Sequence, residues 1–198
     1  MMNDVKIIIA DIRCFRRKRE EILVQIAPCY VKKYQEHKME KDKMQEIVSG
    51  LLLKEYLGIV SDHQLSYNEY GKPMLTFGKR HFNLSHSGDY VVLAIADCEV
   101  GADVEERMPC HDATVKKVYR EEQQKELEVL TGSEKDEKFT EIWTKYEAVL
   151  KLDGVGFANG WKDISMGNHH IFTMKYENCY ISCATETEAE IEFIKYEG

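Results

Sequence analysis

Apolar residues recur along the chain with two different periods, and each period predicts a kind of secondary structure. Apolar or alternating runs predict a first strand over residues 7–14 and a second, strongly apolar strand over residues 90–96. Apolar positions spaced three and four apart predict helices over residues 31–57, 113–130 and 136–152. Beyond residue 160 the alternation returns and predicts three or four strands, around Ile164, 171–172, 180–181 and 191–193.

The order of these elements predicts an α+β protein made of two α/β subdomains. Each half has helices that cover one face of a mostly antiparallel sheet. The boundary between the halves is expected near Asp97, which gives one subdomain over residues 1–97 and another over residues 98–198.

Composition narrows the class of protein. The chain has 198 residues with 43% hydrophobic content, which is enough for a substantial core. With 35 acidic and 27 basic residues the net charge is −8, which argues against nucleic acid or an anionic membrane as the main partner. The apolar run near the N-terminus is too short for a signal peptide or a membrane span, so we expect a cytoplasmic protein. The six cysteines are scattered and indicate neither a disulfide framework nor a zinc site.

The stretch from Val100 to Glu106 holds the first candidate chemistry. Side chains two apart in a strand project from the same face, so Asp103 and Glu105 are expected to point the same way. Two carboxylates on one face repel each other unless a cation lies between them, and such oxygen ligands suit Mg²⁺ bound together with phosphates. The alternative interpretation is a solvated edge strand with scattered acids.

Three further segments are candidates for phosphate binding or proton transfer. Gly71 and Pro73 predict a turn with Lys72 at its apex, where a lysine either binds phosphate or simply faces water. Ser85 and His86 are predicted in a loop after a short strand over residues 82–84. They offer donors to an anion, or the histidine is satisfied by backbone carbonyls. Glu147 and Lys151, four apart, share one face of the last helix, which on its own predicts an ordinary ion pair within the helix.

Taken in order, four segments resemble the motifs of the Sfp-type 4′-phosphopantetheinyl transferases, over roughly residues 26–157. Any one of them is weakly specific, but four in sequence are specific. They are Tyr70-Gly71-Lys72-Pro73, Phe82-Asn83-Leu84-Ser85-His86-Ser87-Gly88, Val100-Gly101-Ala102-Asp103-Val104-Glu105 and Trp143-Thr144-Lys145-Tyr146-Glu147-Ala148-Val149-Leu150-Lys151.

The resemblance implies a fold, a reaction and a set of roles. The family folds as two subdomains related by a pseudo-twofold axis. Its members use Mg²⁺ to move 4′-phosphopantetheine from coenzyme A to a serine of an apo acyl or peptidyl carrier protein, and they release 3′,5′-ADP. The implied metal ligands are Asp103, Glu105 and Glu147, the implied catalytic residues are Glu147 and Lys151, and the implied coenzyme A contacts are Lys33, Lys72, Ser85, His86 and Lys151.

Two positions depart from the family pattern. The family usually has lysine where this chain has Tyr146, and relatives often carry an arginine where this chain has Gln45, so the contact with the 3′-phosphate is expected to weaken or to pass to Lys43. An active, monomeric transferase is the first interpretation. A non-catalytic relative that binds coenzyme A or carrier protein is the alternative, and a Mg²⁺-dependent phosphohydrolase is a third.

Overall fold

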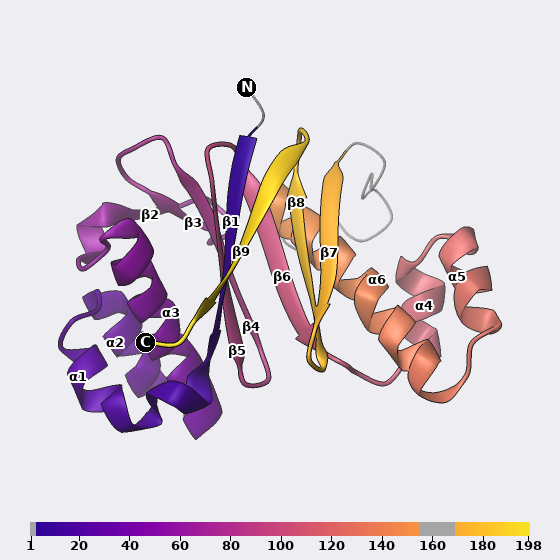
Figure 1. The fold of residues 1–198 in the computed structure, drawn as a ribbon, viewed down its shortest axis with the longest axis horizontal. Helices are drawn as coiled ribbons and strands as arrows, with labels where there is room; N and C mark the ends of the chain where they lie inside the picture. Colours follow the sequence, from indigo (N-terminus) through magenta and orange to yellow (C-terminus); the bar gives the residue numbers. More distant parts are fainter. Residues whose placement is uncertain (1–2, 155–168) are drawn as a thin grey trace.

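The structure is a computed structural model that describes residues 3–154 and 169–198, and Figure 1 shows two sheets side by side between two groups of helices. One sheet has the strand order β4-β5-β1-β9, the other has the order β6-β8-β7, and β2 and β3 form a separate hairpin. The strands are β1 (Asn3–Asp11), β2 (Leu65–Tyr67), β3 (Pro73–Leu75), β4 (His81–Ser87), β5 (Tyr90–Ala96), β6 (Val100–Glu106), β7 (His170–Tyr176), β8 (Cys179–Thr185) and β9 (Ala189–Tyr196). The α+β class is confirmed.

Strand β1 organises the larger sheet, because it pairs antiparallel with β5 on one side and parallel with β9 on the other. The predicted first strand ran to residue 14, whereas the observed strand ends at Asp11. The Asp11 carboxylate accepts a hydrogen bond from the Arg13 amide and so caps a 3₁₀ helix, η1 (Ile12–Lys18). A second short 3₁₀ helix, η2 (Asp62–Gln64), precedes β2.

The first group of helices covers one face of this sheet and comprises α1 (Arg19–Leu23), α2 (Pro28–Glu36) and α3 (Glu40–Leu57). The prediction of one helix over residues 31–57 is wrong, because His37 and Met39 are extended, with ψ of 144° and 135°. The break lets α2 fold back against α3, which buries apolar side chains that one straight helix would leave apart. The predicted end at Gly58 is confirmed, with φ of 66°.

The second group comprises α4 (Asp112–Val118), α5 (Glu121–Glu128) and α6 (Gly132–Asp153). The prediction of one helix over residues 113–130 is also wrong, because the backbone is extended at Tyr119, with ψ of 147°. The Tyr119 ring stacks on Tyr146 at 5.6 Å, and its hydroxyl donates to the Phe139 carbonyl. The predicted last helix is confirmed as α6, which ends at Gly154 with φ of 68°.

Three apolar clusters fill the spaces between the layers. One lies between α1–α3 and the larger sheet, one between the two sheets, and one between the smaller sheet and α4–α6. Strand β5 faces the first cluster on one side and the second on the other, which explains why nearly all of its residues are apolar. None of the described helices is long and apolar enough to cross a membrane.

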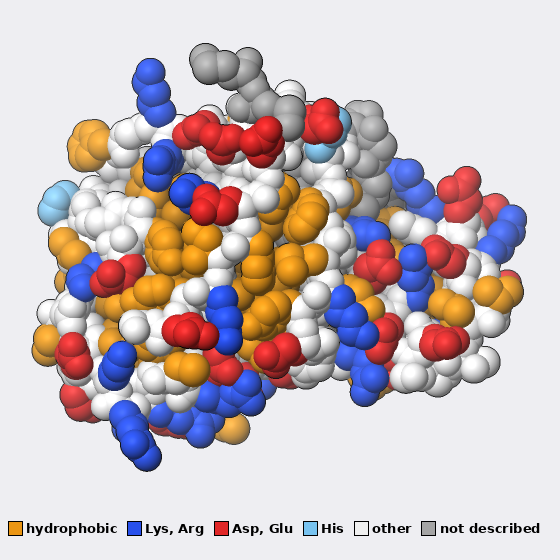
Figure 2. Space-filling view, viewed as in Figure 1, with side chains coloured by type: hydrophobic (Ala, Val, Ile, Leu, Met, Phe, Trp, Pro, Cys, Tyr) orange, Lys and Arg blue, Asp and Glu red, His pale blue; other side chains and the backbone are white. Residues whose placement is uncertain are grey.

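The C-terminal strands divide between the two sheets. Strands β7 and β8 join β6, whereas β9 returns to the first sheet beside β1, so residues on both sides of the predicted boundary at Asp97 build that sheet. The strand predicted around Ile164 lies outside the described residues. Between the free edges of β7 and β9, Figure 2 shows apolar side chains on the surface in the middle of the molecule.

Candidate functional site

Strand β6 lies directly against α6, and a glycine makes this contact possible. A Cβ atom on Gly101 would stand 2.0 Å from the Ala148 carbonyl oxygen and 2.2 Å from the Leu152 amide nitrogen. Asp103 and Glu105 lie two and four residues after Gly101. The close approach of the strand to the helix brings them near to Glu147 and Lys151. The prediction that the two strand carboxylates project from one face is confirmed by their contacts, since both meet serines of β4.

Asp103 is the most deeply buried acid of the site, with 2% of its surface exposed. Its Oδ1 atom accepts hydrogen bonds from Ser85 Oγ at 2.8 Å and from Lys151 Nζ at 2.7 Å. Its Oδ2 atom is buried and has no hydrogen-bond partner within residues 3–154 and 169–198. Buried carboxylate oxygens seldom stay unpaired, so this atom is free to take a further cation or donor.

Glu105 and Glu147 complete a cluster of three acids whose charges influence one another. Burial is the largest influence that raises the pKa of Glu105, followed by the charge of Asp103, while hydrogen bonds from Ser87 and Trp143 and the charge of Lys151 lower it. Burial also raises the pKa of Glu147, to about 7, and the charges of Asp103 and Glu105 add to this effect against Lys151. The predicted trio is therefore one electrostatic unit.

We tested whether these residues fit a divalent cation. Within the part of the chain that the structure describes, no three acids, histidines or cysteines close around one point, and the Lys151 ammonium supplies the positive charge beside Asp103. The chemistry of the donors nevertheless fits Mg²⁺. Three carboxylates offer hard oxygens, and one buried oxygen lacks a partner among the described residues. Burial, followed by the charges of the neighbouring acids, raises the pKa of both Glu105 and Glu147, and a bound cation would relieve both effects.

The lysine of the Gly-Lys-Pro turn reaches the end of α6. Lys72 Nζ donates to the Leu152 carbonyl at 3.0 Å and pairs with Glu99 at 3.2 Å, and its side chain is only 10% exposed. The side chain of Asn68 also binds this helix end, by donating to the Gly154 carbonyl at 2.8 Å. Lys72 therefore neutralises the negative end of α6 in this structure. Its role at a coenzyme A phosphate remains a prediction.

Ser85 and His86 belong to β4, so the prediction that the strand breaks before Ser85 is wrong. The strand continues to Ser87 because its backbone pairs with β5 as far as Ser87 and Tyr90, and the serine hydroxyls find further partners on β6. Ser85 Oγ accepts hydrogen bonds from Lys151 and the Val104 amide and donates to Asp103, so all its bonding capacity is used. His86 is exposed, and partial loss of solvent around its ring is the largest influence in lowering its pKa.

The remaining predicted cation, Lys33, lies in α2 and faces an acid. Its Nζ atom is 3.7 Å from Glu46 Oε2 and 4.8 Å from the centre of the Tyr30 ring. His37 Nε2 approaches the other oxygen of Glu46 at 3.4 Å. Gln45, at the position where relatives often carry arginine, is buried and donates to the Gly88 carbonyl. Its amide therefore holds the β4–β5 turn.

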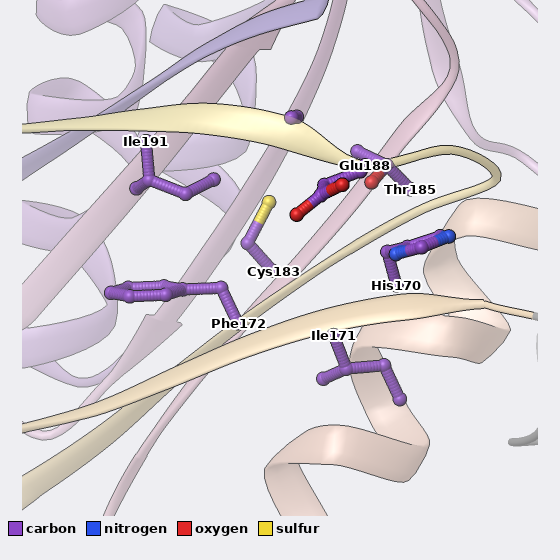
Figure 3. A pocket seen from close by; sticks show the side chains of 8 residues that line it. His170, Ile171, Phe172, Cys183, Thr185, Glu188 and Ile191 are labelled. Atoms are coloured by element: carbon purple, nitrogen blue, oxygen red, sulfur yellow. The ribbon is translucent and has the colours of Figure 1, made fainter. Parts of the chain in front are cut away.

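A cavity of about 280 Å³ joins segments that are far apart in the sequence. Lys72 and its turn, Asn83, Glu147 and Lys151 all line it, so the cavity brings together three of the four motifs that the sequence singled out. A second cavity of about 230 Å³ lies between β7 and β9, where Cys183, Glu188 and Ile191 surround it (Figure 3). None of the predicted site residues lines this second cavity.

Tyr146, which replaces the lysine usual before the last acid, points away from the acids. It is 1% exposed, and its hydroxyl donates to Gln123 of α5 at 2.8 Å. It therefore joins α5 to α6, as its place on the apolar stripe of the helix predicts. Ser87 and Trp143 both bind Glu105, and the sequence alone did not link either of them to that acid. The alternation of polar residues at positions 83, 85 and 87 was the available signal for the serine.

Comparison with known proteins agrees with this site. Residues 99–191 match the model of the 4′-phosphopantetheinyl transferase superfamily, a segment that contains all three acids and Lys151. Three curated relatives are similar over part of their length. The 4′-phosphopantetheinyl transferase psf-1 of Bacillus pumilus is 36% identical over 46% of this chain and 39% of its own. Sfp of Bacillus subtilis is 28% identical over 57% of this chain and 50% of its own. AcpT of Salmonella typhimurium is 30% identical over 60% of this chain and 62% of its own.

The matched segments thus span about half the length of the Bacillus relatives. Within this chain they include the strand that carries Asp103 and Glu105 and the helix that carries Glu147 and Lys151. Over residues 99–191 the chain is similar to the 4′-phosphopantetheinyl transferase superfamily, and Sfp-type transferases are among its relatives.

Proposed function

We propose that this protein transfers 4′-phosphopantetheine from coenzyme A to a serine hydroxyl of an apo acyl or peptidyl carrier protein, with Mg²⁺ as cofactor. The observation that carries the proposal is the cluster of Asp103, Glu105, Glu147 and Lys151 at the seam between β6 and α6. The names of the curated relatives support the same reaction. The carrier protein and coenzyme A are therefore its proposed partners.

The reaction requires one bond to form and one to break at phosphorus. The serine oxygen attacks the β-phosphorus of coenzyme A, the bond from that phosphorus to the bridging oxygen breaks, and 3′,5′-ADP leaves. Negative charge gathers on the phosphate oxygens as this happens, and the site must neutralise it. A Mg²⁺ ion held by Asp103, Glu105 and Glu147 would supply most of that neutralisation.

Glu147 is the proposed acceptor of the serine proton. Without a metal ion, burial raises the pKa of Glu147 to about 7. A bound Mg²⁺ would lower this pKa and keep the carboxylate deprotonated, and so able to accept the proton, at neutral pH. Lys151 lies one turn further along α6 and lines the same cavity, so its ammonium is placed to stabilise the departing phosphate. In this structure the same ammonium pairs with Asp103.

The proposal also covers where the protein works and in what form. All six cysteines are free, as expected in the reducing cytoplasm. We propose a cytoplasmic monomer with neither nucleic acid nor a membrane as partner, supported by the net charge of −8. Carrier proteins of this class are commonly acidic, so docking must use a local apolar or basic patch rather than long-range attraction.

Mass spectrometry of a panel of apo carrier proteins tests the proposal. Incubation with coenzyme A and Mg²⁺ should add one phosphopantetheinyl group to at least one carrier, and Asp103→Asn should abolish the addition. Lys145→Met is the matched control, because Lys145 lies on α6 but pairs with Glu141 outside the acid cluster. Binding of coenzyme A without any mass gain across the panel would support the non-catalytic alternative. Release of free phosphopantetheine without a carrier would support a phosphohydrolase.

A further inference from the structure

Strands β4 and β6 are joined by side chains instead of a backbone ladder. Each is the edge strand of its own sheet, so every second amide of β6 needs an acceptor outside β8. Three side chains of β4, two residues apart, provide those acceptors. Asn83 Oδ1, Ser85 Oγ and Ser87 Oγ accept from the amides of Ala102, Val104 and Glu106 at 3.0, 3.3 and 3.1 Å.

The two serines of this row also bind the acids of the site. Ser87 Oγ donates to Glu105 Oε2 at 2.7 Å, and Ser85 Oγ donates to Asp103 Oδ1 at 2.8 Å. Asp103 directly precedes Val104, whose amide donates to Ser85. Glu105 directly precedes Glu106, whose amide donates to Ser87. A hydroxyl has one proton, so each serine commits its only donor to a carboxylate and is itself fixed by a backbone amide.

We propose that Ser85 and Ser87 are positioning residues, which hold the carboxylates of Asp103 and Glu105 in the orientation that binds the divalent cation. The inference rests on the proposed function, because it takes the two acids to be metal ligands. Groups that orient metal ligands in this way typically change metal affinity by about 10-fold to 100-fold when they are removed. It follows that the β4 serines act on the metal through the acids, without touching it themselves.

Ser87 gives the cleaner test, because Ser85 also contacts Lys151. We would measure Mn²⁺ binding to the intact protein by electron paramagnetic resonance of the free ion, which requires neither coenzyme A nor a carrier. Ser87→Ala should weaken Mn²⁺ binding about tenfold. Ser87→Thr keeps the hydroxyl and should restore binding to within about threefold of wild type.

A matched control separates positioning from a general loss of stability. Ser49 is buried, whereas Ser87 is half-buried, and the Ser49 hydroxyl donates to the Gln45 carbonyl in α3, outside the acid cluster. Ser49→Ala removes a hydroxyl of equal size and should leave Mn²⁺ affinity unchanged. If Ser87→Ala fails to fold, Ser87→Cys replaces it, since a thiol fills the same space but donates weakly.

The outcomes distinguish this inference from the proposed function. A Mn²⁺ affinity for Ser87→Ala within twofold of Ser49→Ala would overturn the positioning role, and so would a wild-type protein that binds no Mn²⁺. A tenfold loss that threonine restores supports the role, even if no carrier is ever modified. Failure of every carrier in the panel would overturn the proposed reaction alone.

Discussion

Replacement of Lys151 by methionine tests the electrostatics of the site directly. The Asp103 side chain is 3% exposed and the Lys151 side chain 30%, and 2.7 Å separates their charged atoms. Loss of one partner from a fully buried pair costs about 3–5 kcal/mol, whereas an exposed pair is worth about 0–1 kcal/mol. Since only the aspartate is fully buried, we expect Lys151→Met to lower the free energy of unfolding by about 2 kcal/mol.

Thermal unfolding followed by circular dichroism measures this loss. For a chain of this size about 2 kcal/mol corresponds to a fall of roughly 4–8 °C in Tm. Millimolar Mg²⁺ should recover more Tm in the variant than in wild type, because a cation bound to the acids replaces the missing ammonium. Lys145→Met is the control and should shift Tm by less than about 2 °C. If the Tm of Lys151→Met equalled the Tm of this control, the reasoning would be refuted.

Three further predictions concern the acids and the seam. With divalent metal chelated, the pKa of about 7 for Glu147 lies above its ordinary value of 4.5, so its contribution to stability is full below pH 4.5 and is lost as pH rises through 7. The difference in Tm between wild type and Glu147→Gln should therefore change between about pH 4.5 and pH 7, and a constant difference would contradict the assignment. Glu46→Gln should free Lys33 and lower the KM for coenzyme A about threefold, with a smaller effect for dephospho-coenzyme A; equal effects on both donors would show that Lys33 does not meet the 3′-phosphate. Gly101→Ala should lower stability by about 3 kcal/mol or more in urea titrations, since its Cβ would overlap the Ala148 carbonyl; wild-type stability would show that α6 can move away from β6.

Periodicity predicted the elements well where the residues of one segment determine its secondary structure. The stripe on α6, the glycines that end α3 and α6, and the doubly buried strand β5 all follow from local patterns. The two errors in helix length have one cause. His37 and Tyr119 are compatible with a helix, and the backbone leaves the helical conformation there because folding back buries more apolar surface.

Single-residue chemistry was predictable, but the partners of each residue were not. The spacing of Asp103 and Glu105 was enough to place both on one face. Nothing in the sequence indicates that Lys72 binds the end of α6, because that contact depends on how two halves of the chain meet. For the same reason the serines of β4 were assigned to a loop. The alternation of polar residues at positions 83, 85 and 87 is compatible with a strand, but it does not show which groups the hydroxyls bind.

The position of β9 has a consequence for how the protein is made. Residues 3–10 pair with residues 189–196, so this edge of β1 stays open until β9 has been synthesised. At about 5–20 residues per second a ribosome needs on the order of ten seconds to pass from one strand to the other. During that time an apolar strand with unpaired amides is exposed to other nascent chains. Chaperone binding to the emerging N-terminal segment is therefore expected to matter more for yield than the stability of the finished protein.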